Sequence, residues 1–350
     1  MGSVTVKDIA QMAGVSVATV SRVINQNGRF SPETERRVRE VIEKCHYQPN
    51  QLAKGLRQHR TASVGIMVPN IANEFFSSMI LAMQTELFEH DYAAVIYNTH
   101  ASLELERQCQ ALLAAQSVAG VIAVNSLDDV RGALKRPVPT VYVDRFVDDD
   151  GGGKVACISS DNERSGRLAA RELIESGCHR LALIEARADS PITRLRTQGF
   201  VDELAEAGLE LDSVLVRSSA VTSFERGREL MDEVIDSGRE FDGVFCQADW
   251  LAMGALEALR EHGIEVPRQV CVVGHDDISI ARFGRPPVTT IRQEPQVLGQ
   301  KAAELVVGMI CGEAPTELCT TVPVELVRRE STRAGNRDAL ASPNPPSSLF

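Results

Sequence analysis

From residue 63 onward, short apolar runs alternate with longer amphipathic segments, and this alternation constrains the fold more than any other feature. The runs predicted as strands are 64–68, 93–97, 120–124, 140–143, 180–184, 213–216, 242–246 and 270–273. The segments with helical periodicity are 76–88, 104–115, 163–176, 193–207, 224–237 and one ending near residue 262. Wholly apolar strands are buried on both faces, so we predict doubly wound parallel sheets covered by helices. Two such sheets would hold a ligand between them, at the carboxyl ends of their strands.

The first 60 residues differ from this body in charge. They contain ten basic and five acidic residues, whereas the rest of the 350-residue chain contains 27 basic and 43 acidic residues. The whole chain has a net charge of −11, which argues against a protein that coats nucleic acid along its entire surface. We therefore expect a small head that meets a polyanion and a larger body with another task.

Three short helices are predicted in the head. A residue that can cap a helix precedes each of them, namely Thr5, Ser16 and Ser31. The helices are expected over about 6–13, 17–25 and 32–45. Two helices joined by a tight turn at Gly14, and braced by a third, form a helix-turn-helix unit.

The outward face of the second helix has the chemistry of a helix that reads the major groove. Val17 and Ala18 are small apolar residues that could contact thymine methyl groups, and Arg22 can donate two hydrogen bonds to guanine. Candidates for further DNA contacts, mostly to phosphates, are Thr5, Ser16, Thr19, Ser21 and Asn25. A helical bundle with solvated polar residues is the alternative that the spacing alone leaves open.

The residues of the head are more specific than their spacing. Thr5-Val-Lys-Asp-Ile-Ala, Ala13-Gly-Val-Ser-Val-Ala-Thr-Val-Ser-Arg-Val-Ile-Asn25 and Tyr47-Gln-Pro-Asn50 closely resemble the DNA-binding head of the LacI/GalR family of bacterial repressors. The Val17-Ala18 pair is similar to the galactose-repressor branch of that family. The resemblance implies a hinge helix that folds on the operator and inserts a leucine into the minor groove. The hinge residues that it nominates as DNA contacts are Asn50, Ala53, Lys54, Leu56 and Arg57.

The body resembles the core of the same family. The segments that carry this resemblance are Val272-Val-Gly-His-Asp-Asp-Ile278, Pro287-Val-Thr-Thr-Ile-Arg-Gln293 and Pro323-Val-Glu-Leu-Val-Arg-Arg329. The resemblance implies a fold like that of periplasmic binding proteins, with two lobes between which the chain crosses three times. The implied division is a helix-turn-helix domain at 1–48, a hinge and linker at 49–61, an N-lobe at 62–160 plus 292–322, a C-lobe at 161–291 plus 323–332, and a disordered tail at 333–350. The tail lacks the leucine heptads that join dimers in a tetrameric member of the family, so we expect a homodimer.

Matching the family's ligand-binding positions one residue at a time nominates an effector pocket. Arg196 and Asp276 take the positions of a ligand-binding arginine and aspartate, and their polar groups suit vicinal hydroxyls. Asp249 follows an apolar strand, and Phe75 and Phe76 could stack on a sugar ring. The remaining candidates are Trp250 and, more weakly, Asn70, Asn73, Asp144 and Gln293.

Several of these residues also have a purely structural interpretation. Arg196 could pair with Asp276 or with an acidic residue on a helix. Phe76 could belong to the core, and Trp250 could be either a stacking wall or ordinary packing. Asp277 is expected to be structural, so Asp276 alone is predicted as the ligand-binding aspartate.

Two residues depart from the family pattern in this region. Ala248 stands where an asparagine commonly precedes the aspartate, which removes one polar contact. Glu74 replaces a proline. An acidic residue in the pocket would disfavour an anionic ligand, so we predict a neutral sugar rather than a sugar phosphate.

Other function classes have little support in the sequence. No apolar run approaches the length of a membrane span or forms a secretory signal, so a cytoplasmic protein is expected rather than a free-standing sugar-binding protein. The eight cysteines form no CxxC pair and are expected to be reduced core residues, without a metal. No nucleophile elbow, HExxH, Walker loop or GxGxxG motif points to an enzyme or a cofactor.

We predict a transcriptional repressor that a sugar releases from double-stranded, pseudo-palindromic operator DNA; co-repression by the effector is the open alternative.

Overall fold

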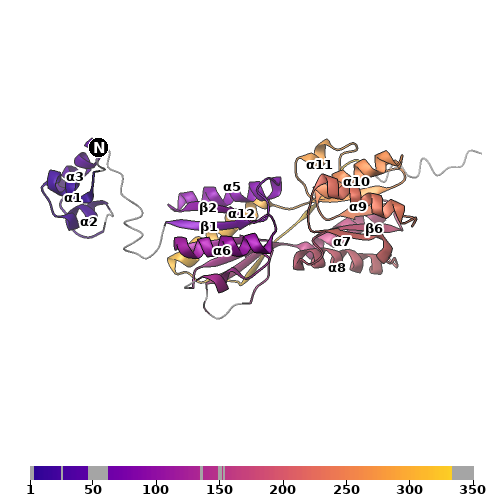
Figure 1. Cartoon of the computed structure of the whole chain (residues 1–350), viewed down its shortest axis with the longest axis horizontal. Coiled ribbons are helices and arrows are strands. Elements are labelled where there is room, and N and C mark those ends of the chain that lie inside the picture. The colour runs from indigo at the N-terminus through magenta and orange to yellow at the C-terminus, as the bar shows by residue number, and fades with distance from the viewer. Residues whose placement is uncertain are drawn as a thin grey trace, which may run out of the picture. The chain divides into compact units, whose positions relative to one another are not determined.

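The computed structural model describes residues 4–24, 27–45, 62–134, 137–148, 152 and 154–332. The chain divides into two compact units, Met1–Ala62 and Ser63–Phe350, and each is described by itself (Figure 1). The predicted hinge at 49–61 and tail at 333–350 lie outside the described residues. No helix within the described ranges is long and apolar enough to cross a membrane.

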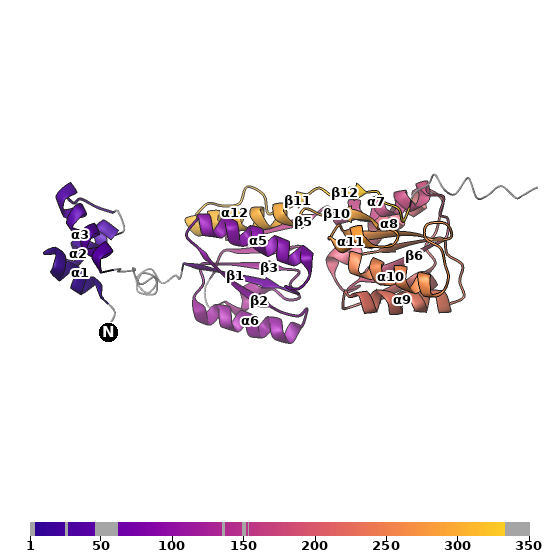
Figure 2. The same cartoon turned by 90° about the horizontal axis from the view of Figure 1, so that it is seen from above.

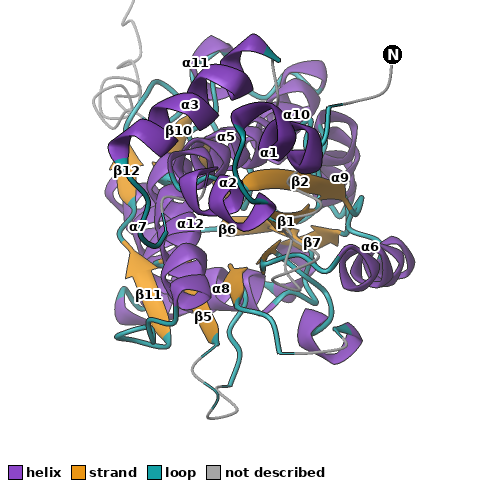
Figure 3. Ribbon diagram, turned by 90° about the vertical axis from the view of Figure 1, so that its left-hand side faces the viewer, coloured by secondary structure: helices purple, strands orange, loops and turns teal. Residues whose placement is uncertain are grey.

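The first unit is the predicted three-helix bundle (Figure 3). Its helices are α1 (Val6–Ala13), α2 (Val17–Ile24) and α3 (Pro32–Lys44). The predicted caps are confirmed: Thr5 forms a capping box with Asp8, Ser16 Oγ accepts from the Thr19 N–H at 3.1 Å, and Ser31 caps α3. The core consists of Ile9, Ala10, Ala13, Val20, Val23 and Val38. Because these residues recur at helical spacing, each helix buries one face and exposes the other.

The second unit contains two sheets, of which the first has the strand order β11-β5-β4-β3-β1-β2. Its strands are β1 (Ser63–Val68), β2 (Ala93–Asn98), β3 (Gly120–Val124), β4 (Thr140–Val143), β5 (Val155–Ser160) and β11 (Cys319–Val322). All pairings described in this sheet are parallel. Helices α5 (Glu74–Glu89) and α12 (Pro295–Cys311) lie on one face and α6 (Leu103–Gln116) on the other (Figure 2). A 3-10 turn, η1 (Val130–Ala133), follows β3.

The second sheet has the order β12-β10-β9-β8-β6-β7. Its strands are β6 (Leu181–Ala186), β7 (Val216–Ser219), β8 (Gly243–Cys246), β9 (Cys271–Asp276), β10 (Thr289–Arg292) and β12 (Glu325–Val327). Only β12 is antiparallel to its neighbour among the described pairings. Helices α7 (Asn162–Glu175) and α8 (Pro191–Glu206) cover one face, and α9 (Phe224–Asp236) and α10 (Asp249–Glu261) cover the other (Figure 2). The short helix α11 (Ile280–Phe283) follows β9.

The chain passes between the two sheets three times, after β5, after β10 and after β11. We call the part built on the first sheet the N-lobe and the part built on the second sheet the C-lobe. This architecture confirms the predicted fold class. The strand predicted at 213–216 is displaced, because Asp212 caps a 3-10 turn, η2 (Ser213–Leu215), and β7 begins only afterwards. Strands β5, β10, β11 and β12 were not predicted. Polar residues interrupt the apolar pattern of β10 and β11, and β12 has only three residues, whereas the apolar start of β5 was overlooked.

The prediction that all cysteines are reduced is wrong for one pair. Cys157 on β5 and Cys319 on β11 form a disulfide, and their Cα atoms lie 4.4 Å apart. The two residues are direct partners in the register of adjacent parallel strands. They are 162 residues apart in the sequence, so no local motif could reveal that the fold would bring them together.

Candidate functional site

The exposed face of α2 is the first candidate site. Val20 and Val23 point into the bundle, whereas Val17, Ala18 and Arg22 are exposed. The cap from Ser16 starts the helix immediately before Val17, so these three side chains occupy the outer face from its first turn. The arrangement leaves two apolar side chains and one guanidinium free to approach the edges of bases.

The loop after α2 supports the side chain of Arg22. Gly28 has a φ of +94°, and a Cβ atom added there would lie 3.3 Å from Cδ of Arg22. The aliphatic part of Arg22 therefore passes close over a residue without a side chain, and its charged end stays at the surface.

The other predicted DNA contacts fall into two groups. Ser16 and Thr5 are exposed, but the Thr5 hydroxyl is bonded to the Asp8 carboxylate at 2.7 Å within the capping box. Thr19 and Ser21 are half-buried on α2. Six predicted contacts lie outside the described residues: Asn25, Asn50, Ala53, Lys54, Leu56 and Arg57.

The second candidate site is a cavity of about 350 Å³ between the two lobes. Eight of the ten predicted effector-binding residues line it: Asn70, Asn73, Phe75, Phe76, Asp144, Arg196, Asp276 and Gln293. Most of them follow strands of the two parallel sheets, as the topology requires. Asn70 and Asn73 come after β1, Asp144 after β4 and Gln293 after β10, while Arg196 lies on α8.

Arg196 is a buried guanidinium that lies against neutral partners. Its Nε donates to Oδ1 of Asn162 at 2.7 Å and its Nη1 donates to the Gln247 carbonyl at 3.2 Å. Burial lowers the pKa of Arg196, although the charges of Asp276 and Asp144 oppose this effect. Among the described residues no carboxylate forms an ion pair with it, so the alternative in which Arg196 pairs with Asp276 finds no support.

Asp276 is held by two neighbours. The Gln293 side-chain amide donates to Oδ1 of Asp276 at 2.7 Å, and His275 Nδ1 lies 2.9 Å from the same oxygen. His275 is fully buried, and this burial, together with the charge of Arg196, lowers the pKa of His275 to about 4. A neutral His275 therefore donates its Nδ1 proton to Asp276, and the carboxylate faces the cavity in a fixed orientation.

Asp144 and two glutamines supply further buried polar atoms to the cavity wall. Oδ1 of Asp144 accepts from the Ser159 hydroxyl at 2.9 Å, and burial raises the pKa of Asp144 although the charge of Arg196 opposes it. The Oε1 atoms of Gln247 and Gln293 are buried and have no hydrogen-bond partner among the described residues. Because an unpaired buried acceptor is costly, these atoms favour a ligand or water that donates hydrogen bonds.

The cavity wall concentrates unusual backbone conformations. Nine non-glycine residues in the described chain have a positive φ, and six of them line the cavity: His100, Ala101, Asn125, Asp144, Arg187 and Asp276. Such conformations cost free energy and tend to cluster at functional sites. Their location supports the cavity as the second site on grounds independent of side-chain chemistry.

Asp249 and Trp250 do not line the cavity, contrary to the prediction. Asp249 is fully buried, with Oδ1 accepting from the Thr290 hydroxyl at 2.6 Å and Oδ2 from the Ile278 N–H at 2.9 Å. Burial and the nearby charge of Asp276 raise the pKa of Asp249 well above its usual value. Trp250 packs against the apolar cluster of the N-lobe. Both lie at the start of α10, one and two residues beyond Ala248, which lines the cavity together with Gln247.

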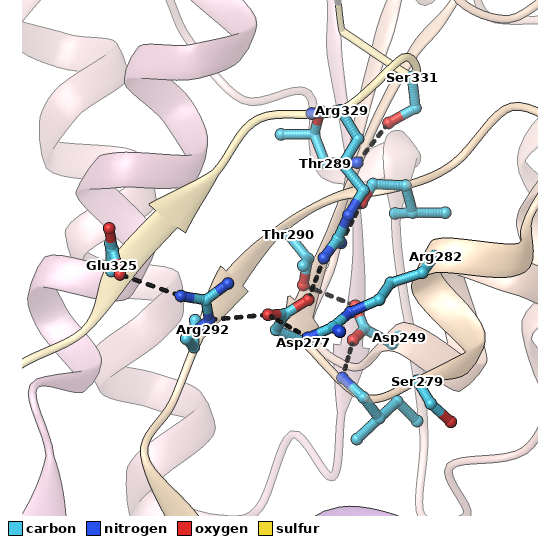
Figure 4. Close-up of polar contacts among 12 residues, drawn as sticks. Asp249, Asp277, Ser279, Arg282, Thr289, Thr290, Arg292, Glu325, Arg329 and Ser331 are labelled. Carbon is cyan, nitrogen blue, oxygen red and sulfur yellow. Dashed lines mark hydrogen bonds and ion pairs between the residues drawn. The ribbon is translucent and has the colours of Figure 1, made fainter.

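Asp277 is structural, as predicted, and anchors the segment that carries Asp276 (Figure 4). Its carboxylate is 2% exposed and accepts a hydrogen bond from Arg292 Nε at 2.7 Å. Arg329 donates to the other oxygen, and Arg282 lies 3.6 Å away. Burial alone would raise the pKa of Asp277, but the bonds from Arg329 and Arg292 lower it below its usual value.

Some wall residues were missed by the sequence analysis. His100 and Asn125 follow β2 and β3, and Arg187 follows β6. The rule that ligands meet the carboxyl ends of parallel strands would have found all three. Phe76 both lines the cavity and packs on the N-lobe cluster, so it combines the two roles considered for it. Glu74 is not part of the wall; its carboxylate binds Ser279 instead.

The chain is similar to known proteins over nearly its whole length. A model described as bacterial regulatory proteins, lacI family, matches residues 5–50, and a periplasmic binding protein-like domain matches residues 170–332. The chain is 31% identical to the HTH-type transcriptional regulator GalR of Escherichia coli (strain K12), over 96% of this chain and 97% of that protein. It is also similar to the lac repressor dimer bound to operator and the anti-inducer ONPF, with a TM-score of 0.83, 27% identity and coverage of 95% and 99%. A complex of the transcriptional regulator CelR with cellobiose gives a TM-score of 0.72 at 31% identity and covers 94% and 99%.

Proposed function

Because this chain belongs to the LacI family of bacterial regulatory proteins, we propose that it is a transcriptional repressor released from its operator by a small neutral sugar. The observation that carries the proposal is the combination of an exposed α2 face with a polar cavity between two lobes. The head has the groups to read base edges, and the cavity has the groups to bind a polyhydroxylated ligand. The chain then acts by binding alone, without enzymatic activity, as a cytoplasmic homodimer on a pseudo-palindromic operator.

We also propose the roles and boundaries that the sequence suggests. The domains are the head at 1–48, the hinge and linker at 49–61, the N-lobe at 62–160 plus 292–322, the C-lobe at 161–291 plus 323–332 and the tail at 333–350. The last two lobe boundaries are supported by β11 in the first sheet and β12 in the second. Effector contacts come from the eight predicted wall residues together with Arg187 and Gln247.

The charges around the cavity support a neutral ligand. The wall contains two arginines, Arg187 and Arg196, and two aspartates, Asp144 and Asp276, so the formal charges of the four side chains cancel. Glu74 lies outside the wall, so the preference for a neutral ligand is supported by this charge balance and not by Glu74. An anionic ligand would upset the balance in a site where burial strengthens electrostatic interactions.

The shape and the polar atoms of the cavity support a sugar. Its volume of about 350 Å³ is near the lower end for ligand pockets, which suits a molecule of one or two sugar rings. The unpartnered oxygens of Gln247 and Gln293 need hydrogen-bond donors, and sugar hydroxyls provide them. Phe75 and Phe76, with ring centroids 5.3 Å apart, add an apolar surface for the C–H face of a ring.

Release requires a difference in affinity between two arrangements of the lobes. A sugar must bind the arrangement that is incompetent for DNA more tightly, by about 1–3 kcal/mol, to lower operator affinity about 5- to 150-fold. Because its polar contacts come from both lobes, the ligand is sensitive to their relative position.

The proposal can be tested with the full-length protein and a library of genomic fragments. A gel shift should select a fragment, and its retention should fall when a hexose, a pentose or cellobiose is added in excess. Asp276→Asn should still retain the fragment but should respond only to much higher sugar concentrations, whereas Arg22→Ala should bind the fragment more weakly and discriminate less well at one base pair. Failure to select any fragment, consumption of the sugar, or stronger retention with sugar would each contradict the proposal.

A further inference from the structure

A hydrogen-bonded contact joins the two lobes beside the cavity. Glu74 is the first residue of α5 in the N-lobe, and Ser279 lies between β9 and α11 in the C-lobe. The Ser279 N–H lies 3.1 Å from Oε1 and 3.0 Å from Oε2 of Glu74, and the Ser279 hydroxyl donates to Oε2 at 2.5 Å. One carboxylate of the N-lobe thus receives both donors of one residue in the C-lobe.

The two residues are adjacent in sequence to the cavity wall. Glu74 stands between Asn73 and Phe75, which both line the cavity, and Asn73 caps α5 by accepting from the Phe75 N–H at 2.9 Å. Ser279 is three residues after Asp276. Because Glu74 belongs to the first turn of α5 and only two residues separate Ser279 from Asp276, we expect a shift of Ser279 relative to Glu74 to move Asp276 relative to the N-lobe wall.

An apolar contact accompanies the polar one. Ile278 is 4% exposed and belongs to the apolar cluster of the N-lobe, although it lies in the C-lobe segment. Ile280 and Trp250 pack against the same cluster. The segment Ile278–Ile280 therefore docks on the N-lobe through two apolar side chains, and Glu74 binds the residue between them.

From this arrangement we infer that Glu74 is a positioning residue that sets, through Ser279, how closely the C-lobe wall of the cavity approaches the N-lobe. Glu74 does not touch the ligand; it holds the segment that carries Asp276 in place. The inference deepens the proposed function, since it concerns the same cavity, but its first test needs no effector. Both residues are exposed to solvent, but the carboxylate accepts charge-assisted hydrogen bonds from a backbone N–H and from a hydroxyl of the other lobe. Loss of these bonds should therefore change the population of lobe arrangements.

The first experiment uses the full-length protein without ligand and two measurements. Trp250 is the only tryptophan and packs from the C-lobe helix α10 against the apolar cluster of the N-lobe, so its emission reports how closely the lobes pack. Small-angle scattering reports lobe separation. Glu74→Ala should shift the Trp250 emission to longer wavelength and increase the radius of gyration. Glu74→Gln, which keeps one acceptor oxygen, should shift both less. The matched control is Glu89→Ala, at the exposed other end of α5, which should leave both unchanged.

A double-variant comparison assigns the effect to Ser279. Ser279→Ala removes the hydroxyl but keeps the N–H, so its shift should be smaller than that of Glu74→Ala. The double variant should shift no further than Glu74→Ala alone, because the two groups act through one contact. Emission and scattering unchanged in Glu74→Ala, or fully additive shifts in the double variant, would overturn the inference. Urea unfolding checks that each variant is folded. If Glu74→Ala does not fold, the same comparison is made with Glu74→Gln.

A second experiment uses cellobiose as the probe. If cellobiose binds the wild-type protein, the affinity of Glu74→Ala for cellobiose should differ from that of the wild type by about 5-fold. The affinity of Glu89→Ala should equal that of the wild type. An affinity equal in the two variants contradicts the inference while leaving the proposed sugar effector intact. Absence of any sugar response in the wild type counts against the proposed function instead, and the ligand-free emission test still decides the role of Glu74.

Discussion

Arg22 on α2 and Arg196 on α8 are both guanidinium groups available to a binding partner, but their surroundings are opposite. Arg22 is exposed, and the aliphatic part of its side chain passes close to Gly28. Arg196 is buried, bonded to Asn162 and Gln247, and surrounded by other polar groups that are themselves held in place. The DNA-contacting side chains of the head therefore lie on the surface of a bundle whose core does not include them. The polar residues of the cavity are buried inside the second unit.

The difference has a consequence for mutation. Residues on the α2 face can change without loss of folding free energy, because little of their surface is buried on folding. Residues in and behind the cavity affect binding and stability together, because removing one leaves a buried partner unsatisfied. Four predictions test this separation, in order of decreasing effect.

The largest effect is expected from Asp277→Ala. The change leaves Arg292 and Arg329 without the buried carboxylate that they share, and breaking such a group by removing one partner costs about 4 kcal/mol. The free energy of unfolding of the second unit, measured by urea denaturation, should fall by this amount. Asp128→Ala, which removes a half-exposed acid 3.4 Å from Arg107, should change the free energy of unfolding by less than about 1 kcal/mol. Similar losses in the two variants would contradict the anchoring role of Asp277.

The next effect is a pH dependence caused by His275. Its pKa is lowered to about 4 in the folded protein, below the usual value of about 6.5 that it regains on unfolding. The unfolded chain therefore takes up a proton first, and the contribution of His275 to stability is lost as the pH falls from about 6.5 to about 4, by about 3 kcal/mol in total. The free energy of unfolding of His275→Gln, relative to that of the wild type, should therefore increase as the pH is lowered. Urea unfolding of both proteins at pH 7, 5.5 and 4.5 measures this difference. A constant difference between the two proteins would show that His275 titrates normally.

Arg22→Ala tests the other side of the comparison. It should weaken binding to the selected operator by about 2 kcal/mol and relax the preference at one base pair, because one bidentate contact is lost. The free energy of unfolding should stay within about 0.5 kcal/mol of the wild type. Binding measured across operators substituted at single base pairs checks the first part, and thermal unfolding checks the second. An unchanged base preference would contradict the placement of α2 in the groove.

Val17→Ala should have the smallest effect. Val17 is 38% exposed and does not belong to the core of the head, so trimming it should change the free energy of unfolding by less than about 0.5 kcal/mol. Operator affinity should fall by about 0.5 kcal/mol, and only for operators that carry thymine at the contacted position, because the lost contact is with the methyl group. Replacing that thymine by uracil should reproduce the loss in the wild-type protein. An equal loss on every sequence would indicate a backbone contact instead.

The fold of the head was predictable almost completely, because its information is local. The caps at Thr5, Ser16 and Ser31 and the apolar spacing between them fix three helices without reference to the rest of the chain. The two sheets were predictable for the same reason where their strands are wholly apolar. The strands β10, β11 and β12 were not, because they are short and polar and lie next to the segments that cross between the lobes. The strand β5 was also missed, although it begins with four apolar residues.

The cavity was predictable in part. The family resemblance and the position of residues after strands placed Asp144, Arg196 and Asp276 correctly on its wall. Asp249 was misplaced, because a carboxylate at the start of α10 can turn toward the cavity or toward β10, and the partners that decide this are distant in sequence. Glu74 was expected in the pocket but contacts the other lobe instead. The cause is the same, because its partner Ser279 is 205 residues away in the sequence.

The positive φ values on the cavity wall limit how such a protein can be adapted to a new effector. At Asn125, Asp144 and Asp276 the backbone accepts asparagine, aspartate or glycine far more readily than a β-branched residue, whose cost there would be about 1–3 kcal/mol. Few substitutions are therefore tolerated at these three positions when the protein is redesigned as a biosensor. Phe75, Phe76 and Gln247 have no such backbone restriction. Libraries that aim at altered ligand selectivity should place their diversity there and leave the left-handed positions intact.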